Sequence, residues 1–323
     1  MKFWYALKES WTALTSHDAL NLHFPISDAF TVALWERPGR WASDAQLSTW
    51  VEELRQVALA GQEGKELPEY GVLLGTREEL AQRVIVMVYD TRENPPKPVG
   101  FNALTFFDIP VGERVEPVLH LGLTFIDPGY QRQGLPGLLY GLAAFMLLFK
   151  NRLQGYWISN VTQVPAVVGL VSDNYAEVFP HYSGRTRQTW LHLVLARAIM
   201  RSHRAAFGVA DDAPFEPSLQ IIRDAYTGGS DHLKKRWEDA PKHRKPQVNQ
   251  FCQQQLDYQR GDDVLQLGRC TVGSTLGFLR SRLPPGSPQR LLVQALMLFS
   301  LALVMPLVQW LFPQQRDFRW QRA

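Results

Sequence analysis

The spacing of apolar residues along the chain predicts helices first and strands later. Between residues 43 and 58, apolar side chains recur every three or four positions, which is typical of a helix with one buried face. Residues 84–89 and 99–107 are short runs rich in β-branched and aromatic residues, and a proline-containing turn separates them. We therefore expect a mostly helical segment before residue 80, followed by an antiparallel hairpin.

The pattern after the hairpin alternates between strand and helix periods. We expect a third strand over 115–126, a strongly apolar helix over 135–153, a strand over 156–160, a short helix over 165–171 and a last extended segment over 177–182. This alternation predicts an α/β core.

Residues 183–290 have a different composition, and we interpret them as an extension of unknown role. A basic amphipathic helix is expected over 188–206. A second basic stretch, 231–246, also contains acidic residues and prolines, and its only aromatic residue is Trp237. This mixture favours a solvated linker, and contact with anionic lipid is the alternative.

The C-terminal part contains a candidate membrane helix over 291–312. These 22 residues include no ionisable side chain, and about 20 helical residues cross a hydrocarbon core. Because Pro306 and two glutamines interrupt the run, an apolar helix that packs on the body or on another copy is the alternative. We expect this segment to contact membrane lipid.

Composition restricts the partners and the compartment. The 323 residues carry 34 basic and 31 acidic side chains, a net charge of +3, which produces no strong field for polyanions, so no nucleic acid is expected. Cys252 and Cys270 lack the spacing of a zinc site, so we expect no metal and reduced thiols. The first 20 residues have no long apolar run. We expect a membrane-associated protein whose main body is cytoplasmic.

Segment 121–139 carries the clearest chemical signal. A strand expected to end at Phe125 and Ile126 leads through a turn into a helix start that contains Gly134 and Gly137. The first amides of a helix have no intrahelical acceptor, and glycine lets a ligand approach them closely. With the helix dipole, such amides bind phosphate oxygens. A plain strand-to-helix turn with a glycine for tight packing is the alternative.

This segment resembles the GNAT acyltransferase superfamily. The matching residues are Ile126, Pro128, Tyr130, Gln131 and Gly134, with Leu138 and Leu139 as the apolar helix positions. The order of elements between residues 84 and 182 also agrees, so the resemblance covers roughly 100 residues. It implies a GNAT-like, mostly antiparallel mixed sheet flanked by helices, with 81–182 as the acyl-CoA core. We interpret 1–80 as a helical N-terminal part of this core, and we expect a helical C-terminal extension that ends in the apolar helix.

The resemblance implies acyl-coenzyme A as co-substrate. The pyrophosphate would lie on the turn, and the thioester carbonyl would meet the strand edge at 123–126. The implied binding residues are Phe125, Ile126, Gln131, Arg132, Gln133, Gly134 and Gly137. Pro136 stands where the family has its second Gly or Ala, and proline has no amide hydrogen, so one phosphate donor is missing.

Acyl transfer from a thioester to an amine needs a base for the amine proton and an acid for the leaving thiolate. His120 and Glu116 are four residues apart, so they share a face of a regular strand, and the resemblance implies a base on this strand. A satisfied histidine and a solvated glutamate are the alternative. Tyr175 and Tyr182 are the nearest downstream tyrosines for the acid, although the short helix before them has none.

The function expected from these residues is a membrane-associated N-acyltransferase that moves an acyl group from coenzyme A to an amine acceptor. The alternative is a catalytically inactive GNAT-fold scaffold, anchored at a membrane, that binds protein partners. The identity of the amine and the oligomeric state, including a homo-oligomer, stay open.

Overall fold

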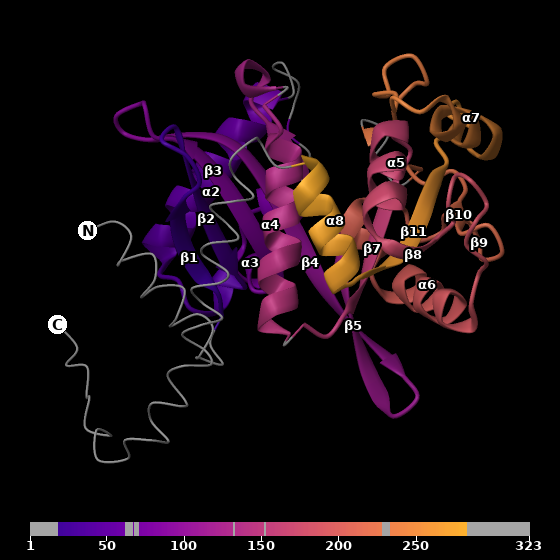
Figure 1. Ribbon diagram of the computed structural model, residues 1–323. Coiled ribbons are helices and arrows are strands. Elements are labelled where there is room, and N and C mark those ends of the chain that lie inside the picture. Colours follow the sequence, from indigo (N-terminus) through magenta and orange to yellow (C-terminus); the bar gives the residue numbers. More distant parts are fainter. Residues whose placement is uncertain are drawn as a thin grey trace.

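The computed structural model describes residues 19–61, 67, 71–131, 133–151, 153–227 and 233–282 (Figure 1). The strands are β1 (Asn21–Pro25), β2 (Phe30–Glu36), β3 (Arg83–Asp90), β4 (Lys97–Val111), β5 (Arg114–His120), β6 (Thr124–Ile126), β7 (Tyr156–Thr162), β8 (Ala176–Phe179), β9 (Phe215–Glu216), β10 (Ile221–Ile222) and β11 (Asp263–Cys270). The α-helices are α2 (Asp44–Gly61), α3 (Arg77–Leu80), α4 (Leu135–Lys150), α5 (Pro165–Asn174), α6 (Trp190–Ser202), α7 (Pro246–Gln255) and α8 (Val272–Arg282). Short 3-10 turns lie at Pro38–Arg40, Gly71–Leu73, Pro128–Tyr130 and Arg204–Phe207.

The described strands form one mixed, mostly antiparallel sheet. Their order is β1-β2-β3-β4-β5-β7-β11-β10-β9, with β6 paired to β4 and β8 paired to β11. Among the described strands, β5 and β7 make the one parallel pair. The predicted α/β class, with a mostly antiparallel sheet flanked by helices, is confirmed.

The prediction of a mostly helical segment before residue 80 is wrong for residues 21–36. They form the hairpin β1–β2, which continues the sheet beyond β3. Leu34 is buried on one face of the sheet, whereas Ala33 and Trp35 are buried on the other. Because both faces are covered, the strand lacks the alternation of apolar and polar residues that marks a half-exposed strand. The helix expected from residue 44 is present as α2.

Helices cover both faces of this sheet. Phe101 of β4 packs in the cluster beneath α2, and Phe107, further along the same strand face, packs in the cluster beneath α6. Leu104 points to the opposite face, where it packs in the cluster beneath α4. On that opposite face α8 lies between α4 and α5 and contacts both (Figure 1). The sheet is therefore buried on both sides along its centre.

Residues 183–282 contribute to the same sheet. Strand β11 pairs antiparallel with the whole length of β7, from Val264 opposite Thr162 to Cys270 opposite Tyr156. The segment interpreted from sequence as an extension thus contains a central strand of the fold, and α6 from the same segment covers the sheet.

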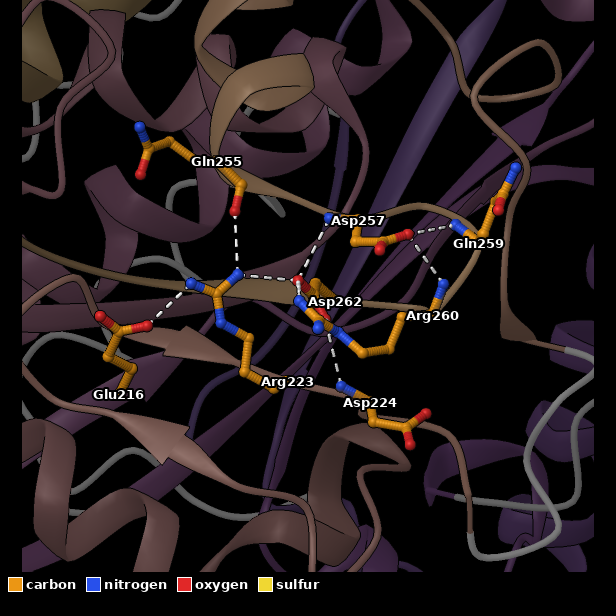
Figure 2. A network of polar contacts seen from close by, with 8 residues as sticks. All are labelled: Glu216, Arg223, Asp224, Gln255, Asp257, Gln259, Arg260 and Asp262. Carbon is orange, nitrogen blue, oxygen red and sulfur yellow. Dashed lines mark hydrogen bonds and ion pairs between the residues drawn. The ribbon is translucent and has the colours of Figure 1, made fainter.

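A buried ion-pair network fixes the turn that precedes β11 (Figure 2). The Asp262 carboxylate accepts hydrogen bonds from Arg223 at 2.8 Å and from Arg260 at 2.7 Å. Backbone amides of Asp257 and Asp224 donate to the same carboxylate at 3.1 and 3.2 Å. Burial raises the pKa of Asp262, but the bonds from the two arginines outweigh it and hold the pKa at about 2.

The neighbouring carboxyl group, Asp263, is in the opposite situation. Its Oδ2 accepts a hydrogen bond from the Tyr226 hydroxyl at 2.5 Å, and its buried Oδ1 has no partner among the described residues. Burial, together with the nearby Asp262 charge, raises the pKa of Asp263 to about 7. Asp263 therefore stays protonated in the folded chain at mildly acidic pH.

We expect Asp263→Asn to change the pH dependence of stability. The unfolded carboxyl loses its proton near pH 4 and the folded one near pH 7, so the folded chain binds more protons between them and loses stability as pH rises. Between pH 4.5 and 7.5 this loss is about 3 kcal/mol from one site, and the asparagine variant lacks it. Urea unfolding at pH 4.5 and 7.5 measures both chains.

Asp262→Asn is the matched control, and its effect has the opposite sign. The lowered pKa of Asp262 contributes stability that is present above about pH 4 and is lost as the pH falls toward 2. This variant is therefore less stable than the parent by a similar amount at pH 4.5 and at pH 7.5. Identical pH profiles for the parent and Asp263→Asn would contradict the protonated state of Asp263.

Candidate functional site

The strand expected over 115–126 is interrupted, and both of its parts pair with β4. Up to His120, β5 also runs parallel to β7 on its other side, with His120 opposite Ser159. From Thr124 onward, β6 pairs with β4 alone, with Thr124 opposite Asn102. Meanwhile β7 continues along β11. Strands β6 and β7 therefore part at residues 121–123.

The interruption leaves backbone amides without acceptors. The Leu121 amide still donates to the Ser159 carbonyl at 2.7 Å, and the Leu123 carbonyl accepts from Ala103 at 2.8 Å. Within the described part of the chain, no carbonyl accepts from the amides of Gly122 and Leu123. A Cβ atom at Gly122 would lie 2.2 Å from the Ala103 carbonyl oxygen, so this close approach requires glycine.

Two anchors hold the turn that follows β6. Asp127 accepts from the Gly129 amide at 2.9 Å and from the Lys97 ammonium at 2.8 Å. The Tyr130 hydroxyl donates to the buried Asp90 carboxylate at 2.9 Å. Both anchors reach back to β3 and β4, so the direction in which the chain enters α4 is fixed.

Helix α4 begins at a glycine in the left-handed region. Gly134 has φ of +77°, and its carbonyl accepts from the Leu138 amide at 3.1 Å, which closes the first helical turn. The amides of Leu135 and Gly137 belong to this turn and have no intrahelical acceptor. Pro136 between them supplies no hydrogen.

The turn is open to solvent where the phosphate site is expected. Gln131 and Gln133 are exposed and Gly134 is half-buried, whereas Gly137 is buried. Arg132, also expected at this site, lies outside the described residues. The structure thus brings Gln131, Gln133, Gly134 and Gly137 together at one helix start.

The two strand-edge residues point in different directions. Phe125 packs toward the α2 side, with its ring centroid 5.6 Å from that of Phe101. Ile126 packs against the apolar cluster beneath α4. Both side chains are half-buried.

A polar trio that sequence reasoning missed lies beneath the second turn of α4. Asn102 Nδ2 donates to Thr124 Oγ1 at 3.2 Å, and the Thr124 hydroxyl donates to the Tyr140 oxygen at 2.7 Å. Burial raises the pKa of Tyr140. Asn102 is fully buried, and its Oδ1 has no partner among the described residues. The only sequence signal was a hydroxyl group in an otherwise apolar helix.

His120, expected to be a base, lies in a buried aromatic cluster. It is 2% exposed, its Nδ1 is 3.1 Å from Ser159 Oγ, and the rings of Phe107 and Phe207 lie 5.3 and 5.2 Å from its own. Burial, and then the Arg83 charge, lower the pKa of His120 to about 3. This environment argues against a base role and fits the alternative of a satisfied histidine.

The other expected catalytic residues are apart from His120 and from each other. Glu116 is half-buried in the β4–β5 hairpin, on the order of 13 Å along the strand from His120. Tyr175 is buried at the C-terminal end of α5, where burial, and then the nearby Cys270 thiol, raise its pKa well above the usual value. Within the described chain, no hydrogen bond links Tyr175 to β6, whereas one links Tyr140 to Thr124 of that strand.

Other chemistry has little support in the described part of the chain. No group of three or more His, Cys, Asp or Glu residues there is arranged to hold a metal ion. No helix there is long and apolar enough to cross a membrane, and the candidate membrane helix over 291–312 lies outside the described residues. A shallow cavity of about 520 Å³ lies beside Arg223 and residues 254–260, but the two arginines that line it are already engaged by Asp262.

Comparisons with known proteins give only weak likenesses. No family model and no curated protein matches the chain. Among solved structures, the chain is similar to an aminoglycoside acetyltransferase from an uncultured soil metagenomic sample, at 16% identity and a TM-score of 0.28, over 40% of this chain and 74% of that one. It is also similar to a GNAT-family acetyltransferase from Streptococcus pneumoniae, at 18% identity and a TM-score of 0.26, over 38% and 75% of the two chains. A third is the AtaT toxin bound to the C-terminus of its antitoxin and acetyl-CoA, at 16% identity and a TM-score of 0.20, over 24% and 49%.

These TM-scores are too low to carry an argument about this chain. The GNAT-like arrangement is instead visible in the described fold itself. The hairpin β3–β4 is followed by a strand that parts from its parallel neighbour, then by the turn and α4, and then by β7 and α5. The expected GNAT-like fold is present in this order.

We expect His120→Asn to make the chain less sensitive to acid. A histidine whose folded pKa is lowered contributes stability above pH 6.5 that is lost as pH falls, because the unfolded imidazole takes up the proton first. The difference at pH 4.5 is about 2–3 kcal/mol relative to pH 7.5, measured by urea unfolding of both chains. If the parent and the variant lose the same stability between pH 7.5 and pH 4.5, the pKa of folded His120 is not lowered. His120 would then again be a candidate for the catalytic base.

Proposed function

We propose that this protein binds an acyl-coenzyme A at the start of α4 and transfers the acyl group to an amine. The observation that carries the proposal is the parting of β6 from β7 directly before an open helix start. The strand interruption at residues 122–123 offers unpaired amides to a carbonyl group, and the start of α4 offers unpaired amides to phosphates. Acyl-coenzyme A contains both groups, because it is a thioester joined to a diphosphate.

The helix start supplies the phosphate contacts. Amides of Gly134, Leu135 and Gly137 and the positive end of the α4 dipole favour anionic oxygens. The side chains of Gln131 and Gln133 are exposed beside them and add amide donors. The anchors at Asp127 and Tyr130 hold the amides in place before the ligand arrives, so little ordering is needed on binding.

The strand interruption supplies the carbonyl contacts. Attack of the amine nitrogen on the thioester carbon places negative charge on the carbonyl oxygen, and the unpaired amides of Gly122 and Leu123 are suited to stabilise it. The C–S bond then breaks, and the thiolate needs a proton. In our proposal the Tyr140 hydroxyl gives this proton, and the proton lost by the amine passes to water and returns to Tyr140.

Tyr140 is preferred to Tyr175 because of its hydrogen bonds. Thr124 on β6 donates to the Tyr140 oxygen, so the phenolic hydrogen stays available for another acceptor. Tyr175 has no such link to the strand edge. In this proposal the catalytic acid is therefore Tyr140 of α4 and not Tyr175 at the end of α5.

A non-catalytic scaffold is the second candidate. It is favoured by Pro136, which removes one phosphate donor, and by the burial of His120 and Tyr175. Membrane attachment through 291–312, and hence a membrane-proximal amine, belongs to both candidates and rests on the sequence alone.

Pro136→Ala is expected to strengthen coenzyme A binding about tenfold. The change restores an amide donor, and a hydrogen bond to a charged group contributes roughly 1.5 kcal/mol. Gly134→Asp is expected to abolish binding, because its carboxylate repels the phosphates. Calorimetry with coenzyme A measures all three chains.

The matched control is Pro246→Ala, which changes an exposed proline in the first turn of α7 and leaves the affinity unchanged. Absence of heat at millimolar coenzyme A in the parent and in Pro136→Ala would remove the acyl donor and leave the scaffold.

Tyr140→Phe is expected to lower kcat by about 10²–10⁴ and to leave coenzyme A affinity unchanged, because only the proton to the thiolate is lost. Release of free thiol from acetyl-coenzyme A with a panel of primary amines provides the assay. Tyr175→Phe is the control and retains activity. Equal losses in the two variants would contradict the assignment to Tyr140.

A further inference from the structure

Helix α8 occupies the position between α4 and α5 on the face of the sheet where β6 and β7 part. It contacts both helices and runs beside α4 (Figure 1). It starts directly after Cys270, which lies opposite Tyr156 at the beginning of β7. Because α4 ends just before β7, the later residues of α8 lie toward the start of α4.

The buried apolar residue among residues 272–278 of α8 is Phe278. It is 5% exposed and belongs to the apolar cluster that also contains Leu135, Tyr140 and Tyr175. A thioester arm that runs from the start of α4 to the edge of β6 needs part of the same space. The ring of Phe278 and such an arm therefore compete.

Helix α8 packs along α4, but few of its described side chains are buried. Val272 and Leu276 are 40% and 42% exposed, and within residues 272–278 only Thr275 and Phe278 are buried. Two glycines, Gly273 and Gly277, lower its helix propensity. The helix is held at its start, where the Thr271 amide donates to Ser274 Oγ at 2.8 Å and the Ser274 amide donates back at 3.2 Å.

A polar group on the same face of the sheet is incompletely paired. Asn102, whose side chain reaches Thr124 beside α4, has a buried Oδ1 without a partner among the described residues. A buried unpaired acceptor is costly, so a ligand donor that reaches it would favour the open form.

From these observations we propose that α8 is an autoinhibitory plug, whose Phe278 side chain leaves the space between α4 and α5 when the arm of an acyl-coenzyme A enters. This inference rests on the proposed function. In the closed form the phosphate site at Gly134 is accessible, and the path to the strand edge is blocked. Binding therefore competes with the packing of one helix.

Changes that stabilise or loosen α8 test the plug. Gly277→Ala adds a methyl group that meets nothing within 4 Å and raises helix propensity, so it should weaken coenzyme A binding about fivefold. Phe278→Ala should strengthen binding by a similar or larger factor. Ser48→Ala, an exposed position in α2 on the other face of the sheet, is the control and leaves the affinity unchanged. Calorimetry with coenzyme A measures the parent and the three variants.

Hydrogen exchange gives an independent readout. With saturating coenzyme A, amides of residues 275–282 should exchange faster than in the free protein, whereas those of α2 stay unchanged. A merely structural helix would exchange at the same rate or more slowly.

The outcomes separate the two proposals. Binding that neither Gly277→Ala nor Phe278→Ala changes, or that Phe278→Ala weakens, overturns the plug and leaves the proposed function in place. No binding in the parent, in Phe278→Ala or in Pro136→Ala overturns the proposed function and the plug with it. Opposite shifts in Gly277→Ala and Phe278→Ala, with faster exchange in α8, support both.

Discussion

The candidate site depends on one constraint, the need of backbone amides inside a sheet to find acceptors. Strand β5 meets this need with β4 on one side and β7 on the other, whereas β6 pairs with β4 alone, so the chain loses β7 between His120 and Thr124. The amides of Gly122 and Leu123 fall between the two ladders. An unpaired amide is costly when it is buried, and the sheet tolerates it here because β7 is already paired with β11. The same pairing that stabilises the fold thus creates the unsatisfied donors.

The constraint also determines where the helix start lies. A strand that leaves its neighbour has to turn. The hydrogen bonds of Asp127 with Lys97 of β4 and of Tyr130 with Asp90 of β3 fix that turn. Gly134 then allows the helix to begin at a left-handed residue. Pro136 suits the geometry of a first helical turn, so it does not disturb the fold. Because proline has no amide hydrogen, a phosphate ligand loses one hydrogen bond there. Folding and binding therefore place different demands on neighbouring positions.

Local patterns were sufficient to predict the elements that depend on local contacts. The apolar spacing of α2, the two strands of the hairpin β3–β4 and the helix start at Gly134 were all visible in the sequence. Strand β2 was missed because burial on both faces removes the alternation that marks a strand, and β1 keeps its alternation over only five residues. The environment of His120 depends on Phe207, which is distant in sequence, and the role of Tyr140 depends on Thr124 in another element. Contacts between distant segments determine these environments, and the local spacing of apolar residues in the sequence cannot predict such contacts.

A plug of this kind works only if its closed form is slightly more stable than its open form, because the apparent affinity falls by the fraction of molecules that are open. Burial of one phenylalanine such as Phe278 contributes about 1.5–3 kcal/mol. The unpaired Asn102 oxygen subtracts roughly 1–3 kcal/mol from the closed form, and each glycine in α8 subtracts up to about 1 kcal/mol. If the two forms lie close in free energy, a ligand needs only a modest preference for the open form to shift the population. Gly273 and Gly277 lie on the exposed side of α8, so they act on this balance through helix propensity and not through packing. A wider apolar stripe on the side that faces α4 and α5 would make the closed form permanent, and the amides of Gly122 and Leu123 would then have no access to a ligand.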